Sequence, residues 1–152
     1  MEEEPHGDEA MNTAKEDAEK LLHALIPFAH QRLQKSREFF PYGGSMSLSG
    51  GIAFDAASDG TEQPPSQALI DMLHEGYKKK AISGGIKACA IIYDSRVLPP
   101  DRTEKQDAIA AAIDHRDGYS VVVFFPYSFD TSGQLRVENP FANTGRKEIF
   151  PE

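Results

Sequence analysis

The chain has 152 residues, of which 16 are basic and 24 are acidic, so its formal net charge is -8. A chain of this length can bury a core of its own as one domain, but its acidic balance lacks the positive surface that a nucleic-acid backbone requires. The single cysteine, Cys89, excludes an internal disulfide framework and a cysteine-based zinc site.

Hydropathy and the N-terminal residues bear on where the protein works. No apolar run approaches the roughly 20 residues that a membrane-spanning helix needs. The N-terminus is acidic and lacks the basic-then-apolar order of a secretion signal. We therefore expect a cytoplasmic protein that contacts neither membrane nor nucleic acid. Residues 1–11 are predicted to form an acidic flexible tail, and residues 12–152 a single α+β domain.

Two stretches carry the three- and four-residue apolar spacing of amphipathic helices. The first runs from residue 14 to residue 33, and Thr13 and Glu16 are placed to form a capping box before it. Pro27 falls inside this stretch and predicts either a kink or the start of another helix. The second stretch follows Pro65. Its predicted buried stripe consists of Leu69, Met72, Leu73, Tyr77 and Ala81.

The remaining patterns are typical of strands. Residues 42–55 read as a hairpin with a glycine turn, and residues 86–98 as a third strand. The strongest local signal is Asp117-Gly118, which lies between two further strand-like runs. With these two residues as the loop, Arg116 faces Tyr119, and Phe124 and Phe125 each face an alanine.

The position of the last predicted strand follows from its composition. Both faces of residues 121–125 are apolar, so this strand is expected in the interior of the sheet. Residues 135–137 are compatible with a short edge strand, and residues 139–152 are predicted to be irregular but packed against the domain.

The predicted fold is α+β, with a single mostly antiparallel five-stranded sheet, two main helices and the order α-β-β-α-β-β-β. Over residues 13–130 this order resembles the profilin-like group of folds, especially roadblock and longin domains. The phrases at residues 38–44, 64–70, 98–102 and 115–121 also look similar to a small uncharacterised bacterial protein family. Neither resemblance implies an activity.

Charged residues on or beside neighbouring strands are the candidate functional groups. The residues predicted to contact a ligand or partner are Asp94, Arg96, Asp114, His115, Arg116 and Tyr119. The same groups are also compatible with structural ion pairs, for which the two arginines are candidate partners. No catalytic residue, metal ligand or cofactor is assigned. His115-Arg116-Asp117 matches the start of a kinase catalytic loop, but Val122 stands where that loop needs asparagine.

Three classes of function stay open. The first is a non-enzymatic protein-interaction module, such as an adaptor, a regulator or an immunity-type inhibitor, which binds a protein partner or a second copy of itself. The alternative is a small-ligand sensor domain with a cleft lined by aromatic residues. Those residues are Tyr42, Phe54, Tyr93 and Tyr119, with Arg96 or Arg116 to fix an anion. The third is a hydrolase-like enzyme that uses Asp94, Asp114 and His115.

Overall fold

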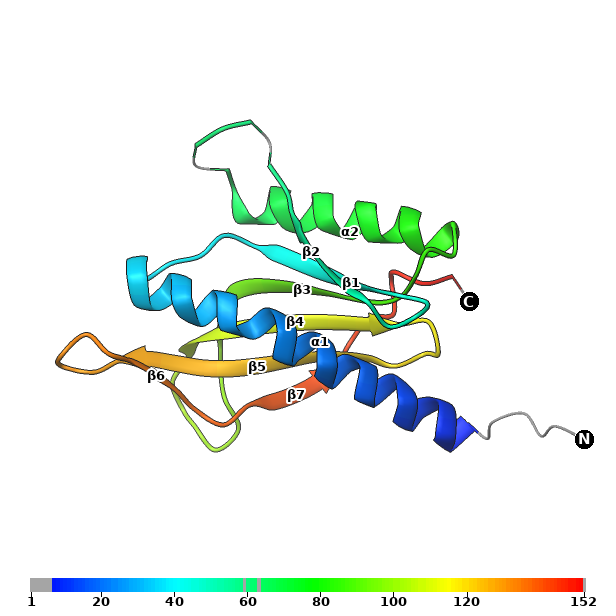
Figure 1. Cartoon of the computed structure of the whole chain (residues 1–152). Coiled ribbons are helices and arrows are strands. Elements are labelled where there is room, and N and C mark those ends of the chain that lie inside the picture. Colours follow the sequence, from blue (N-terminus) through cyan, green and yellow to red (C-terminus); the bar gives the residue numbers. More distant parts are fainter. Residues whose placement is uncertain (1–6, 59, 63, 152) are drawn as a thin grey trace, which may run out of the picture.

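The computed structural model describes residues 7–58, 60–62 and 64–151. Within them, two helices lie against opposite faces of one antiparallel sheet (Figure 1). The elements are α1 (Gly7–Ser36), β1 (Tyr42–Ser47), β2 (Ile52–Ala56), α2 (Ser66–Ile82), β3 (Ile86–Val97), β4 (Gln106–His115), β5 (Ser120–Phe129), β6 (Leu135–Val137) and β7 (Phe141–Thr144). This order confirms the predicted α+β class. The described residues form seven strands and not five, because β6 and β7 extend the sheet.

The strands are ordered β2-β1-β3-β4-β5-β6, and β7 pairs with β5. Every pairing is antiparallel. Strand β5 pairs with β4 on one side and with β6 and β7 on the other. It therefore lies inside the sheet, as its two apolar faces predict. Strand β2 pairs with β1 and forms an edge of the sheet.

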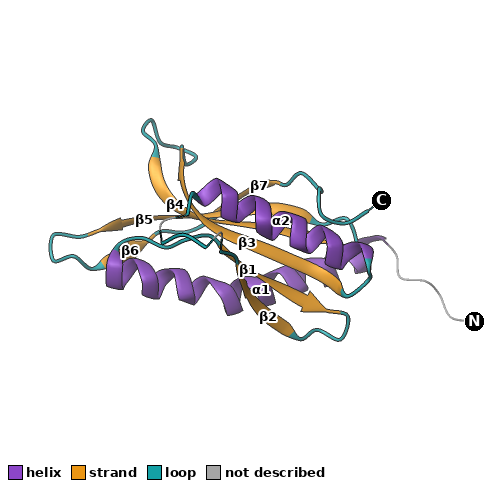
Figure 2. Ribbon diagram, turned by 90° about the horizontal axis from the view of Figure 1, so that it is seen from above, coloured by secondary structure: helices purple, strands orange, loops and turns teal. Residues whose placement is uncertain are grey.

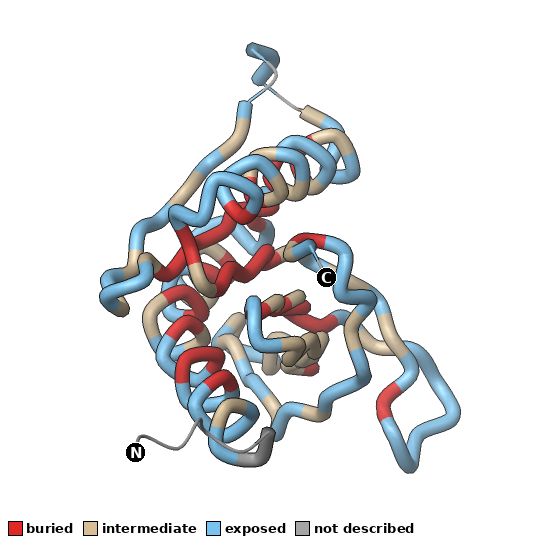
Figure 3. The backbone as a smooth tube through the Cα atoms, turned by 90° about the vertical axis from the view of Figure 1, so that its right-hand side faces the viewer, coloured by how far each residue is buried: buried red, intermediate tan, exposed pale blue. Residues whose placement is uncertain are grey.

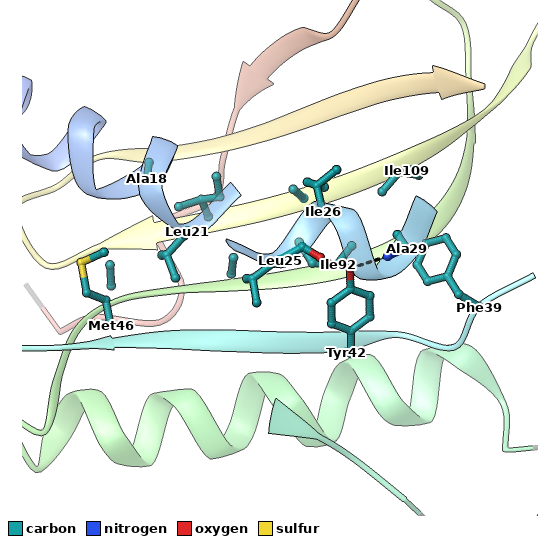
Figure 4. Packing of buried hydrophobic residues seen from close by; sticks show 14 of the residues in the cluster. Ala18, Leu21, Leu25, Ile26, Ala29, Phe39, Tyr42, Met46, Ile92 and Ile109 are labelled. Atoms are coloured by element: carbon teal, nitrogen blue, oxygen red, sulfur yellow. Dashed lines mark hydrogen bonds between the residues drawn. The ribbon is translucent and has the colours of Figure 1, made fainter. Parts of the chain in front are cut away.

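Helix α1 continues through Pro27. Its sheet-facing stripe consists of Ala14, Ala18, Leu21, Leu25, Ala29 and Leu33, all of them buried. Beside the proline, the Tyr42 hydroxyl enters the helix. It accepts a hydrogen bond from the Ala29 N–H at 3.1 Å and donates one to the Leu25 carbonyl oxygen (Figure 4). An inserted side chain of this kind opens one step of the backbone ladder and leaves both backbone groups paired.

The helix begins earlier than the sequence predicts. Gly7–Met11 belong to α1, and residues 1–6 of the predicted tail lie outside the described residues. The Thr13 hydroxyl donates to the Glu9 carbonyl oxygen at 3.0 Å. Thr13 is therefore an interior residue of the helix, and the predicted capping box with Glu16 is wrong.

The β4–β5 hairpin is confirmed, but its predicted register is wrong by one residue. His115 pairs with Tyr119, so the loop has three residues, Arg116 to Gly118. Gly118 has a φ of 89°, the left-handed conformation that such a loop places at its last position. Because of this one-residue shift, each side chain of β5 shares a face with different β4 side chains from those that the predicted register gives it. Phe124 consequently lies opposite Ala110, while Phe125 lies opposite Ile109 on the α1 face.

Each face of the sheet has its own core (Figure 3). The core under α1 includes Leu21, Leu25, Ile92, Ile109 and Ile113. The core under α2 includes Leu73, Tyr77, Cys89, Ile91 and Ile149. Met72, which was predicted in the buried stripe of α2, is 44% exposed. Helix α2 packs on β1 and β3. Seen from above, β1 and β3 lie on one side of α2 and β7 lies on the other (Figure 2).

Candidate functional site

The acidic and histidine residues predicted from the sequence do not meet. Asp114 and His115 are consecutive on β4, so their side chains point to opposite faces of the sheet. Asp94 pairs with Ile109 and His115 with Ala88. The two positions are therefore six residues apart along β4, or about 20 Å. The acid–base group of Asp94, Asp114 and His115 is not assembled in this structure.

His115 belongs to a buried ionic network under α1. Its Nε2 lies 2.8 Å from Oδ2 of Asp17, and the Lys87 ammonium lies 3.3 Å from the same oxygen. Its Nδ1 accepts a hydrogen bond from the Asp117 N–H at 3.0 Å. Nε2 of the neutral ring therefore carries the proton and donates it to Asp17. Because both ring nitrogens are engaged, His115 joins α1 to the hairpin and offers no free nitrogen to a ligand.

Asp17 is a buried charge that the sequence reasoning missed. Burial raises the pKa of Asp17, but the hydrogen bond from His115 and the charge of Lys87 outweigh it and hold this pKa below its ordinary value. Helical spacing was the available signal, since Asp17 lies three residues after Ala14 and four before Leu21, both in the buried stripe.

Two other candidate residues make structural contacts. Asp94 accepts a hydrogen bond from the Tyr127 hydroxyl at 2.8 Å. Burial raises the pKa of Asp94 more than this hydrogen bond lowers it. Arg96 forms an exposed cross-strand ion pair with Asp107 at 3.2 Å. Pairs of this kind contribute little to stability and carry no indication of a ligand.

The four aromatic residues predicted to line one cleft lie in different places. Tyr42 and Tyr119 pack against the α1 core, and Phe54 is 56% exposed on the edge strand β2. Tyr93 lines a cleft on the α2 face. Arg116, a predicted anion contact, is exposed in the hairpin loop. The predicted aromatic cleft is therefore wrong in its composition, although one of its members does line a cleft.

This cleft has a volume of about 540 Å³ and lies between α2, the sheet and the C-terminal segment. Its floor follows three cross-strand rows: Cys89–Asp114–Ser120, Ile91–Ala112–Val122, and a third row in which Tyr93 and Phe124 line the cleft while Ala110 between them is fully buried. In the middle row the central strand, β4, contributes the small Ala112 between the larger Ile91 and Val122. The floor is therefore hollow at Ala112, and the rows change from a polar end to an aromatic end.

The C-terminal segment after β7 forms one wall of the cleft. The Gly145 N–H donates to the Ser120 carbonyl oxygen at 3.0 Å, and the Lys147 N–H donates to the Ser120 hydroxyl at 3.2 Å. A Cβ at position 145 would lie 2.1 Å from that hydroxyl, so this close approach requires glycine. Further on, Ile149 is buried in the core under α2. These contacts hold the segment against β5.

Helix α2 forms the opposite wall. Gln67, Asp71 and His74 face the cleft from this helix. Nε2 of His74 lies 3.2 Å from Oε2 of Glu148, an ion pair that joins the two walls. The cleft is thus bounded by groups that are far apart in the sequence and that only the folded chain brings together.

Asp114 is the least compensated charge at the polar end of the cleft. Burial raises the pKa of Asp114; the Ser120 hydroxyl and the charge of His74 oppose this effect, and Glu148 adds to it. Neighbouring Cys89 is buried, and burial raises the pKa of its thiol far above the ordinary value. Cys89 therefore serves as a small apolar residue and not as a nucleophile.

The described residues also bear on two other kinds of site. No group of three His, Cys, Asp or Glu side chains that could hold a metal ion occurs among them. Neither helix of the described chain is long and apolar enough to cross a membrane.

Comparisons with known proteins give no assignment, because no family model, curated protein or solved structure matches this chain. The resemblances to profilin-like domains and to a small bacterial family therefore stay predictions.

Proposed function

We propose that this protein is a small-ligand-binding domain and that its ligand lies in the α2-face cleft. The observation that carries the proposal is the hollow floor, in which Ala112 separates the larger Ile91 on β3 and Val122 on β5. The volume of about 540 Å³ falls within the range of about 300–1,000 Å³ that is typical of ligand pockets. A mostly apolar floor with polar groups gathered at one end is also typical of such pockets.

The packing of the sheet supports this proposal. Ala111, on the α1 face of β4, is fully buried, whereas Ala112, on the cleft face, is not. Ile91, Val122 and Phe124 supply further apolar surface to the cleft. Covering apolar surface is worth roughly 25 cal/mol per Å², so a ligand with an apolar body gains free energy by filling this hollow.

A fragment screen followed by ¹H–¹⁵N NMR tests the proposal. We expect fragments to shift the amide signals of Ala112, Val122 and Phe124, and Ala112→Leu to abolish these shifts by filling the floor. The matched control is Ala142→Leu, which adds the same atoms at an exposed position of β7 outside the cleft. If no fragment at millimolar concentration perturbs the cleft signals of the wild-type protein, the proposal is wrong.

A second proposal, association with a protein partner or a second copy of the chain, is favoured by the edge strand β2. This strand has a neighbour on one side and contains no proline, lysine or bulge that would protect the edge. Its one charged residue, Asp55, is engaged by Tyr77 and Lys80. Phe54 on β2 and Leu48 in the adjoining turn are 56% and 53% exposed. A paired second strand would cover both the open backbone groups and part of this apolar surface.

Sedimentation analysis tests this second proposal. We expect a concentration-dependent dimer that Phe54→Lys weakens, because a charge at the edge opposes strand pairing. Leu98→Lys is the control, since Leu98 has the same 53% exposure as Leu48 and follows β3, away from β2. A wild-type protein that is monomeric at every concentration would end the self-association form of the proposal.

The proposed cytoplasmic location rests on the unpaired, buried Cys89.

A further inference from the structure

We propose that the cleft binds a small organic cation, with a protonated amine at Asp114 and a flat apolar body over Ala112. This inference rests on the proposed ligand-binding function of the cleft and adds the chemical class of the ligand. It follows from three properties of the cleft: the balance of charge at its polar end, the engagement of its positive groups, and the spacing along β4.

The charge of the cleft favours a cation. Three carboxylates line it, from Asp71, Asp114 and Glu148, and two side chains that can be positive, from His74 and Arg146. An anionic ligand would therefore enter a site in which negative groups outnumber positive ones. A cationic ligand would reverse this imbalance.

The two groups that can be positive, His74 and Arg146, both pair with Glu148 and not with Asp114. Glu148 holds the imidazole of His74 at 3.2 Å through one carboxylate oxygen and lies 3.9 Å from the Arg146 guanidinium through the other. The Arg146 side chain is 87% exposed. The hydrogen-bonding partner of Asp114 is the Ser120 hydroxyl, and His74 acts on Asp114 only through its charge. An ammonium group would supply the counter-charge that the fold does not give to Asp114.

The shape of the floor sets the size of the ligand. Ala112 lies two residues before Asp114 on β4, on the same face and at a distance of about 7 Å. A ring joined to an amine by a two-carbon link spans this interval. The ring would lie over Ala112, between Ile91 and Val122. Beyond them, the Phe124 ring stacks on Phe141 at 5.2 Å between centroids, which gives the apolar end a fixed aromatic wall.

Calorimetric titration with three probes of matched shape tests the assignment. The probes are phenethylamine, the neutral phenethyl alcohol and the anionic phenylpropionate. We expect phenethylamine to bind at least about tenfold more tightly than the alcohol, which is the advantage of a charge-assisted hydrogen bond. Phenylpropionate is expected to bind more weakly than either.

Two variants connect this preference to Asp114. In Asp114→Asn the amide keeps the shape of the side chain and still accepts from Ser120, so the fold is retained and the preference for the amine over the alcohol should be lost. Asp107→Asn removes an exposed charge from the same strand, outside the cleft, and should leave the preference unchanged.

The outcomes separate this inference from the proposed function. If the alcohol or phenylpropionate binds in the cleft as tightly as phenethylamine, or if Asp114→Asn keeps the preference, the cation assignment is wrong and the cleft remains a ligand site. If phenethylamine fails to bind while other fragments shift the cleft amides, the assignment alone is again overturned. If neither the probes nor any fragment perturbs the cleft, both proposals are wrong.

Discussion

The two faces of the sheet place a carboxylate in opposite electrostatic environments. On the α1 face, His115 and Lys87 surround Asp17 and hold its pKa below the ordinary value. On the α2 face, burial raises the pKa of Asp114 without a full counter-charge. A compensated buried charge is part of the architecture, whereas an uncompensated one beside a hollow indicates a place where a ligand completes the structure. The difference separates the structural network from the candidate site.

The same contrast applies to packing. Ala111 and Ala112 are neighbours on β4 and face opposite sides of the sheet. Ala111 is fully enclosed in the core under α1, and Ala112 forms the floor of the cleft. One face is filled by the chain itself, and the other leaves space for a separate molecule.

The largest expected effect is the loss of the network under α1. Asp17→Ala removes the partner of His115 and leaves a buried imidazole and a nearly buried ammonium without their carboxylate. We expect the free energy of unfolding, measured by urea denaturation, to fall by about 3 kcal/mol. The exposed neighbour Glu16 gives the control, because Glu16→Ala should change stability by less than about 0.5 kcal/mol. Equal effects of the two substitutions would contradict the structural role of Asp17.

An intermediate effect should distinguish the two alanines of β4. Ala111→Leu adds three carbon atoms to a filled core and should lower the free energy of unfolding by about 2 kcal/mol. Ala112→Leu adds the same atoms to the cleft, where there is room, and should change it by less than about 0.5 kcal/mol. Thermal and urea unfolding of the two variants measure the difference. Equal destabilisation would indicate that the cleft is closed in solution.

The smallest effect concerns the pH dependence of stability. A carboxyl whose pKa is raised in the folded state stabilises the fold while it is protonated. This contribution is fully present below the pKa of the unfolded state and is lost as the pH rises through the pKa of the folded state. Asp114→Asn should therefore be more stable than the wild type at neutral pH, and the gain should vanish in acid. Asp17 should behave in the opposite way, since its lowered pKa gives stability above the unfolded pKa that is lost as the pH falls. An Asp114→Asn variant less stable than the wild type at neutral pH would contradict this sign.

Local signals predicted much of the fold. Apolar spacing located both helices, and Asp117-Gly118 located the β4–β5 hairpin. The register was missed because the same dipeptide also ends a three-residue loop with glycine in the left-handed conformation. Strand β7 was missed because it is short and its Phe141–Thr144 pairing with β5 depends on residues about 20 positions away.

The candidate site was less accessible to sequence reasoning because its geometry is set by distant contacts. Asp17 and His115 are separated by 98 residues, so no local pattern pairs them. The cleft exists because α2 packs on β1 and β3 while the segment with Glu148 returns to β5. Asp114 was identified as a candidate residue from its charge on a strand, but Ala112 on the same face became informative only once the register was known.

Titration of the aspartate side chains by carbon-detected NMR compares the two faces most directly. We predict that Asp17 titrates below the ordinary aspartate value of about 3.9 and that Asp114 titrates above it. Phenethylamine should move only the Asp114 midpoint, to lower pH. An Asp114 midpoint at or below the ordinary value, without ligand, would contradict the account, because the cleft would then hold no uncompensated charge.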